Sequence, residues 1–196
     1  MIEEKAIFII PGFKQLPTDS SYKDLATILR NEGFFPILIT IPWKKMTISQ
    51  SAEFLLQELQ KINAKKKYLL GFSFGAMIAF LTSTKTDLSG LILCSLSPYF
   101  KEDMSGKNRR RSSMKKHLYR DFSKLHSGTL AKQIKADSIL MLYGADEERT
   151  LIRRVIKTFE QIVSTKKYLL QITGADHDIG NKRYLQIIRK VAKTLN

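Results

Sequence analysis

The chain has 196 residues, of which 43% are hydrophobic and 26% are charged. This length and apolar content are typical of one globular domain with a buried core, and they exclude a wholly disordered chain. A single cysteine, Cys94, excludes an intrachain disulfide framework and a zinc site built from several cysteines. The net charge of +15 leaves nucleic acid, anionic lipid and acidic proteins open as partners.

Two features of the sequence bear on where the protein resides. The first residues, Met-Ile-Glu-Glu-Lys, are acidic where a secretory signal is basic and then apolar. No apolar run approaches the roughly 18 residues that a membrane-spanning helix needs. We therefore expect a cytoplasmic protein without a transmembrane segment.

The first half of the chain alternates apolar runs of strand length with amphipathic runs of helix length. A strand is predicted at 5–10, where the apolar run is stopped by Pro11-Gly12. A helix follows at 21–32, and Gly33 stands just beyond its end. The same patterns predict a strand at 34–41, a helix at 49–62, a strand at 67–71 and a helix at 74–84.

The second half repeats this alternation after one long interruption. It predicts a strand at 90–96, a strand at 138–143, a helix at 147–163, a strand at 167–172 and a helix at 182–195. Strands that are apolar on both faces and are joined by helical crossovers indicate a parallel sheet that is covered on both sides. The predicted fold class is therefore α/β, with a mainly parallel six-stranded sheet and helices on both faces.

The interruption, residues 98–136, is too long for an ordinary connection between two strands. Between residues 101 and 135 it carries 11 Lys and Arg residues against three acidic residues. More than half of the excess positive charge therefore lies in less than a fifth of the chain. We interpret it as an insertion within one domain that spans 1–196.

The segment Gly71-Phe72-Ser73-Phe74-Gly75 lies where a predicted strand turns into a predicted helix. A serine at such a sharp turn has strained backbone angles, and a side chain two residues to either side would collide with its neighbours. The following helix directs its first N–H groups and its positive dipole end toward the turn. The pattern predicts that Ser73 is a nucleophile.

A serine hydroxyl is a poor nucleophile unless a base takes its proton. Two of the three histidines, His117 and His126, lie in the basic insertion and are expected at the solvated surface. His177 instead follows the last predicted strand. In a parallel sheet its loop leaves the same edge as the turn at Ser73. We therefore predict that His177 is the base.

A third group should orient the base from a neighbouring loop. The strand at 138–143 is followed by Gly144-Ala145-Asp146-Glu147-Glu148, where both Asp146 and Glu147 are placed for this role. Acidic residues just before a helix also serve as caps, so one of them can orient His177 while a neighbour caps the helix. We favour Asp146 and keep Glu147 as its rival.

Two backbone N–H groups are placed to bind the oxyanion of an acyl-transfer reaction. One belongs to Phe74, directly after the serine, and the other to Phe13, in the Pro11-Gly12-Phe13 turn after the first strand. The side chains of Phe13 and Phe74 would then line the entrance with apolar surface. Trp43, in a loop at the same edge, is a further candidate for substrate contact.

These motifs together resemble the α/β-hydrolase superfamily. The likeness rests on the Pro11-Gly12-Phe13 turn, the glycine-flanked Ser73, an acid after the penultimate strand and His177 after the last strand. The chain order serine, acid, histidine is that of the superfamily. The resemblance implies a small, minimal six-stranded member in which 98–136 occupies the place of a lid or cap. The superfamily's common Gly-x-x-Asp acid signature would land on Glu147.

The resemblance and the residues together predict a serine hydrolase of esters or thioesters. Ser73 would attack the acyl carbon, His177 would act as base, and Asp146 would orient it, so that no metal or cofactor is required. The basic insertion, with Arg109, Arg110 and Arg111, points to an anionic or carrier-bound acyl substrate, with an acidic carrier protein as a possible partner.

The alternative is a binding protein that recognises nucleic acid or an anionic membrane surface through the basic insertion, with a vestigial triad. Aromatic residues in the insertion, such as Tyr119 and Phe122, could stack on bases. No groove-reading motif is present, so nucleic acid is the less favoured partner.

Overall fold

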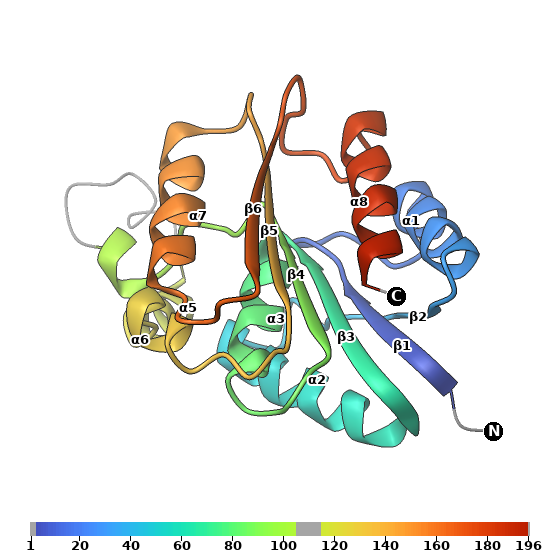
Figure 1. The fold of residues 1–196 in the computed structure, drawn as a ribbon. Coiled ribbons are helices and arrows are strands. Elements are labelled where there is room, and N and C mark those ends of the chain that lie inside the picture. Colours follow the sequence, from blue (N-terminus) through green and yellow to red (C-terminus); the bar gives the residue numbers. More distant parts are fainter. Residues whose placement is uncertain (1–2, 105–114, 196) are drawn as a thin grey trace.

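The computed structural model describes residues 3–104 and 115–195. Its centre is one six-stranded sheet with the strand order β2-β1-β3-β4-β5-β6, in which all neighbouring strands run parallel (Figure 1). The strands are β1 (Glu3–Ile10), β2 (Phe35–Leu38), β3 (Ala64–Phe72), β4 (Gly90–Cys94), β5 (Ile139–Gly144) and β6 (Lys167–Ile172). The predicted α/β class and six-stranded parallel sheet are confirmed.

Helices cover both faces of this sheet (Figure 1). The helices outside the insertion are α1 (Ser20–Asn31), α2 (Ile48–Lys61), α3 (Phe74–Ser83), α7 (Arg149–Gln161) and α8 (Lys182–Thr194). The strand residues alternate between two hydrophobic clusters. One cluster packs against α2, α3 and α7, and the other against α1 and α8. The alternation follows from the period of two along a strand, which sends successive side chains to opposite faces.

Several predicted boundaries differ from those observed, among them the start of β3 at Ala64 and the boundaries of β2, β4 and α7. Strand β2 spans Phe35–Leu38, and Leu38 is the last of its residues in register with β1, opposite Ile9. Strand β4 ends at Cys94, because Ser95 adopts a φ of 52° that leaves the extended conformation. Helix α7 begins at Arg149, because the residues from Gly144 to Glu147 form a turn.

The insertion at 98–136 contributes short helices between β4 and β5. These are the 3₁₀ turn η1 (Lys101–Asp103), α5 (Lys116–Phe122) and α6 (Ser127–Ala131). The Arg154 guanidinium on α7 holds this segment by contacting both carboxylate oxygens of Asp103, with Nη2 at 2.6 Å from Oδ1, and by donating to Ser127 Oγ at 2.6 Å. Asp121 accepts a hydrogen bond from the Ser49 N–H, which joins α5 to α2.

The described helices include none that is both long and apolar enough to cross a membrane.

The parallel sheet determines where the loops that carry the candidate site residues lie. Because all strands are parallel, the loops that follow β1, β3, β4, β5 and β6 leave from one edge. The Pro11-Gly12-Phe13 turn, Ser73, Glu147 and His177 all lie in these loops.

Candidate active site

Ser73 forms the sharp turn between β3 and α3. Its φ of 56° and ψ of −117° confirm the strained backbone expected at this position. Its N–H donates to the Cys94 carbonyl at 2.9 Å, which ties the turn to the neighbouring strand β4. Ser73 is 7% exposed, so its hydroxyl is largely shielded from solvent by the surrounding residues.

The two flanking glycines are required by close backbone contacts. A Cβ at Gly71 would lie 2.3 Å from the carbonyl oxygen of Gly75. A Cβ at Gly75 would lie 2.1 Å from the carbonyl oxygen of Ile10. These distances are far below van der Waals contact, so only glycine allows helix α3 to start against the end of β1. The packing thus brings the turn after β1 next to Ser73.

His177 meets the serine from the loop after β6. Its Nε2 atom lies 2.9 Å from Ser73 Oγ, which is hydrogen-bonding distance. The imidazole packs on the Phe72 ring, with a centroid separation of 4.9 Å. The flanking Asp176 and Asp178 engage other groups, Asn181 Nδ2 and the Gly180 N–H. The structure therefore brings together the two residues that the sequence identified as nucleophile and base.

The acidic side chain that lies against His177 is that of Glu147, the rival candidate, and not that of Asp146, which the sequence favoured. Glu147 Oε1 lies 3.4 Å from His177 Nδ1, and the side chain of Glu147 is fully buried. Asp146 is exposed to solvent. The two acids occupy different positions of one turn: the Glu147 N–H donates to the Gly144 carbonyl, and Glu147, the fourth residue of the turn, has the side chain that is buried beside His177.

The loops after β5 and β6 pack closely together and so fix this geometry. The Asp146 N–H donates to the Ala175 carbonyl at 3.0 Å, and the Ala145 N–H donates to the Ile172 carbonyl at 2.9 Å. A Cβ at Gly144 would lie 2.2 Å from the Ala175 carbonyl oxygen, so glycine is needed there. The backbone of Asp146 therefore supports the site, although its side chain faces away.

The sequence analysis did not identify two hydroxyl groups at this carboxylate: Ser95 contacts Glu147 directly, and Tyr184 contacts Ser95. Ser95 Oγ, just after β4, donates to Glu147 Oε1 and lies 2.7 Å from the Tyr184 hydroxyl on α8. Burial, with smaller contributions from Cys94 and Glu147, raises the pKa of Tyr184 well above its ordinary value. The phenol therefore keeps its proton and can donate it to Ser95.

A further serine, Ser97, contacts the nucleophile directly. Its Oγ lies 3.0 Å from Ser73 Oγ, and it is 3% exposed. The sequence offered one signal for Ser95 and Ser97. Both follow β4, whose carboxyl end lies at the same sheet edge as the loops of Ser73, Glu147 and His177.

The turn after β1, which contains Phe13, is held in place by hydrogen bonds from the N–H of its Gly12. The Gly12 N–H donates to Gln15 Oε1 and to the Tyr22 hydroxyl, both at 2.9 Å. Phe74 is the first residue of α3, and the N–H of a first helical residue has no acceptor within its helix. The ring centroids of Phe13 and Phe74 are 5.3 Å apart, so the side chains of the two residues expected to supply the oxyanion donors are in contact.

Aromatic rings form a continuous chain beside Ser73. Phe13 contacts Trp43 at 5.5 Å and Phe74 at 5.3 Å between ring centroids. Phe74 contacts Tyr99 at 4.9 Å and Phe122 at 5.9 Å. Trp43 is thus part of this wall, as are Tyr99 and Phe122 of the insertion, which the sequence analysis did not assign to the site. We define these five residues as the aromatic wall.

The remaining candidates are exposed at the surface or fall outside the described residues. Arg109, Arg110 and Arg111 fall within 105–114, which is outside the described residues. His117 and His126 are exposed, as expected. No group of three or more His, Cys, Asp or Glu side chains among the described residues is arranged to hold a metal ion.

Solved structures with a similar fold identify the type of fold. Est1E from Butyrivibrio proteoclasticus with bound ferulic acid has a TM-score of 0.80 and 14% identity, covering 98% of this chain and 88% of its own. Alpha/beta hydrolase domain-containing protein 10 from mouse has a TM-score of 0.79 and 12% identity, covering 97% and 88%. The monoacylglycerol lipase of Paleococcus ferrophilus has a TM-score of 0.73 and 16% identity, covering 99% and 95%.

The sequence itself matches no family model and no curated protein. At identities of 12 to 16%, the likeness to solved structures shows the fold alone. The chain therefore has the α/β-hydrolase fold, as its motifs predicted. A hydroxyl, an imidazole and a buried carboxylate arranged in series on this fold have the components of nucleophilic acyl transfer.

Proposed function

We propose that this protein is a serine hydrolase that cleaves esters or thioesters through an acyl-enzyme intermediate. The observation that carries the proposal is the contact of 2.9 Å between Ser73 Oγ and His177 Nε2, with Glu147 Oε1 at 3.4 Å from Nδ1 on the other side of the ring. The His177 side chain is 42% exposed, and a surface histidine without a catalytic role would need neither a buried carboxylate nor a serine on a strained turn.

The proposed reaction has two steps. In acylation, Ser73 Oγ bonds to the acyl carbon while its proton passes to His177 Nε2, and that proton then leaves with the alcohol or thiol. In deacylation, water gives a proton to His177 and its oxygen attacks the acyl carbon, and Ser73 Oγ recovers the proton as the acid is released. Glu147 holds the imidazole orientation, and the N–H groups of Phe13 and Phe74 bind the oxyanion.

The surroundings of Ser73 support an acyl substrate with an apolar part. The aromatic wall lies beside the serine, and Phe13 within it is 44% exposed. Among the compared structures, Est1E holds ferulic acid and the Paleococcus ferrophilus protein is a monoacylglycerol lipase. An apolar or aromatic acyl group would gain about 25 cal/mol for each Å² buried against such a wall.

An anionic group on the substrate is the second part of the proposal. Lys14 follows Phe13 directly, and its ammonium nitrogen lies 5.3 Å from the centroid of the Phe13 ring. The backbone of Lys14 has a φ of 62°, a value that residues other than glycine rarely adopt. The basic insertion adds positive charge, so an acyl ester with a free acid group, or one on an acidic carrier protein, is favoured electrostatically.

The alternative of a binding protein with a vestigial triad gains no specific support. A vestigial site has no requirement for a buried acid, an intact serine–histidine contact and tight glycine packing. We therefore retain the hydrolase as the single proposed function.

Labelling with a fluorophosphonate, which reacts covalently with activated serines, tests this proposal. The folded wild type should be labelled at Ser73, as read out by mass spectrometry, and Ser73→Ala should not react. The matched control is Ser83→Ala, because Ser83 is a buried serine on α3 whose hydroxyl donates to the Phe80 carbonyl. Equal labelling of the wild type and Ser73→Ala, or no labelling of the wild type, would exclude the proposed mechanism.

A further inference from the structure

We propose that Ser97 is a positioning residue for the nucleophile. Its hydroxyl donates a hydrogen bond to Ser73 Oγ and stabilises that oxygen whenever it carries developing negative charge. The inference rests on the proposed function, because it assigns Ser97 a role in the same reaction.

The placement of Ser97 is the first step of the argument. Ser97 lies in the loop after β4, and its Oγ is 3.0 Å from Ser73 Oγ. Strand β4 neighbours β3 on one side, whereas β1, which precedes Phe13, neighbours β3 on the other. Ser73 is therefore approached from one side by the turn proposed to bind the oxyanion and from the other side by Ser97. The two groups serve different oxygen atoms.

The direction of the hydrogen bond follows from counting protons along the chain of contacts. Ser95 donates its proton to Glu147, so it accepts from the Tyr184 hydroxyl at 2.7 Å. The carboxylate faces His177 Nδ1, which fixes the proton on that nitrogen. Nε2 is then an acceptor, and the proton of Ser73 points to it. Ser73 has one proton, so the contact between the two serine hydroxyls uses the proton of Ser97.

The energetic consequence differs between the resting enzyme and the reacting enzyme. In the resting state Ser97 donates to a neutral hydroxyl, which gives a hydrogen bond of ordinary strength. As the proton of Ser73 passes to His177, negative charge develops on Ser73 Oγ and the same bond becomes charge-assisted. An interaction that strengthens only during reaction lowers the barrier rather than the substrate affinity.

The same contact acts again in deacylation. The acyl-enzyme carries Ser73 Oγ as an ester oxygen, which is a weaker acceptor than an alkoxide. When the second tetrahedral intermediate collapses, the bond between the acyl carbon and Ser73 Oγ breaks, and Oγ takes the proton from His177 Nε2. Ser97 stabilises Oγ while it departs, so we expect both steps to depend on it.

A buried serine with a purely structural role has a different partner. Ser83 is as buried as Ser97, but its hydroxyl donates to a backbone carbonyl, that of Phe80, at 2.7 Å. Thr82, also on α3, donates to the Ile78 carbonyl in the same way. Ser97 Oγ instead contacts the Ser73 hydroxyl, which is itself in contact with His177.

The test compares Ser97→Ala and Ser97→Gly, which remove the hydroxyl, with Ser97→Thr, which keeps it, and with the control Ser83→Ala. The rate constant of fluorophosphonate labelling, kcat and KM for a neutral nitrophenyl ester, and the thermal midpoint are measured for each. For both variants that remove the hydroxyl we expect the labelling rate and kcat to fall about 10- to 100-fold. KM and the thermal midpoint should remain near those of the wild type, and Ser97→Thr should recover most of the rate.

Two results would overturn the inference and leave the proposed function intact. One is a wild type that is labelled at Ser73 while Ser97→Ala and Ser97→Gly react at the same rate. The other is a loss of rate that Ser83→Ala reproduces or that tracks a lower thermal midpoint. A wild type that does not react at all would instead refute the proposed function, which separates the two failures.

Discussion

A single carboxylate links three segments of the proposed site. Glu147 lies in the loop after β5. Its Oε1 atom contacts His177, which lies in the loop after β6, and Ser95, which lies in the loop after β4. Sequence alone could not separate Glu147 from Asp146, because both follow the same strand and a one-residue difference in the turn decides which side chain faces the sheet. The turn is fixed by the close packing of Gly144 on Ala175 and by the hydrogen bond from the Glu147 N–H to the Gly144 carbonyl.

Substituting the two acids separately distinguishes their roles. Glu147→Gln keeps the shape but removes the charge that offsets the imidazolium, so we expect kcat/KM for a nitrophenyl ester to fall on the order of 10³- to 10⁴-fold. Asp146→Asn alters an exposed side chain, and we expect a change of less than about threefold, since a surface substitution costs little. Steady-state kinetics on both variants check this. A larger loss in Asp146→Asn than in Glu147→Gln would contradict the assignment.

The strands and the helices outside the insertion are well predicted because each has a strong local signal. The strands read as short apolar runs, and the pattern Gly-x-Ser-x-Gly at a strand–helix junction indicated both the nucleophile and its strain. Contacts between elements had no such signal. Ser95, Ser97 and Tyr184 enter the site through packing of the β4 loop and α8, and Phe122 reaches the aromatic wall from the insertion. Residues far apart in sequence meet there only after the chain has folded.

The junction of β1, β3 and α3 should tolerate no side chain at Gly75. In Gly75→Ala, the added Cβ would meet the Ile10 and Pro11 carbonyl oxygens at 2.1 and 2.4 Å, both of which are backbone atoms. We expect a loss of roughly 3 kcal/mol in the free energy of unfolding and the loss of fluorophosphonate labelling, because α3 must move away from the Phe13 turn.

The control for this substitution is Gly128→Ala on α6. The three atoms nearest to a Cβ there all belong to the Gln161 side chain, which can move aside. Urea unfolding should give this variant nearly the stability of the wild type, since alanine also favours a helix over glycine. Equal stability of Gly75→Ala and Gly128→Ala would show that the close packing against β1 is not required.

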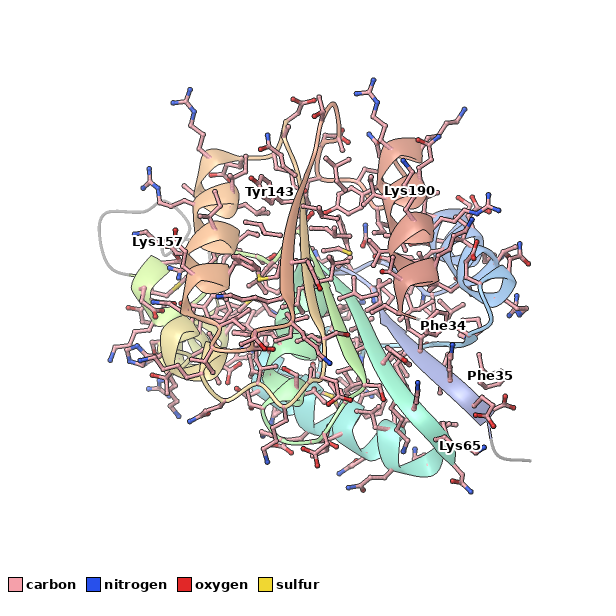
Figure 2. All side chains as sticks on the ribbon, viewed as in Figure 1. Phe34, Phe35, Lys65, Tyr143, Lys157 and Lys190 are labelled. Carbon is pink, nitrogen blue, oxygen red and sulfur yellow. The ribbon has the colours of Figure 1, made fainter. Side chains whose placement is uncertain are left out.

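At the scale of the whole molecule, the positive charge is spread over more than one face. Figure 2 labels Lys157 on α7 and Lys190 on α8, which lie on opposite sides of the sheet, and both residues are exposed. Lys190 lines a cavity with Ser89 and Lys166, which precede β4 and β6, so it lies at the sheet edge opposite to the candidate site. Lys14, by contrast, adjoins Phe13 of the aromatic wall. Substitution can therefore separate local charge from net charge.

The proposed preference for anionic substrates predicts a salt dependence that belongs to Lys14 and its surroundings. For the wild type, kcat/KM on an acyl ester with a free carboxylate should fall several-fold between low salt and about 0.5 M, where the Debye length is only about 4 Å. Hydrolysis of a neutral ester of equal length should change little. Lys14→Gln should weaken the salt dependence and lower kcat/KM for the anionic ester, whereas Lys190→Gln, with the same loss of net charge, should leave both close to wild type. Equal effects of the two variants would mean that the net charge of +15 acts on the substrate only at long range and that the site has no local preference for anions.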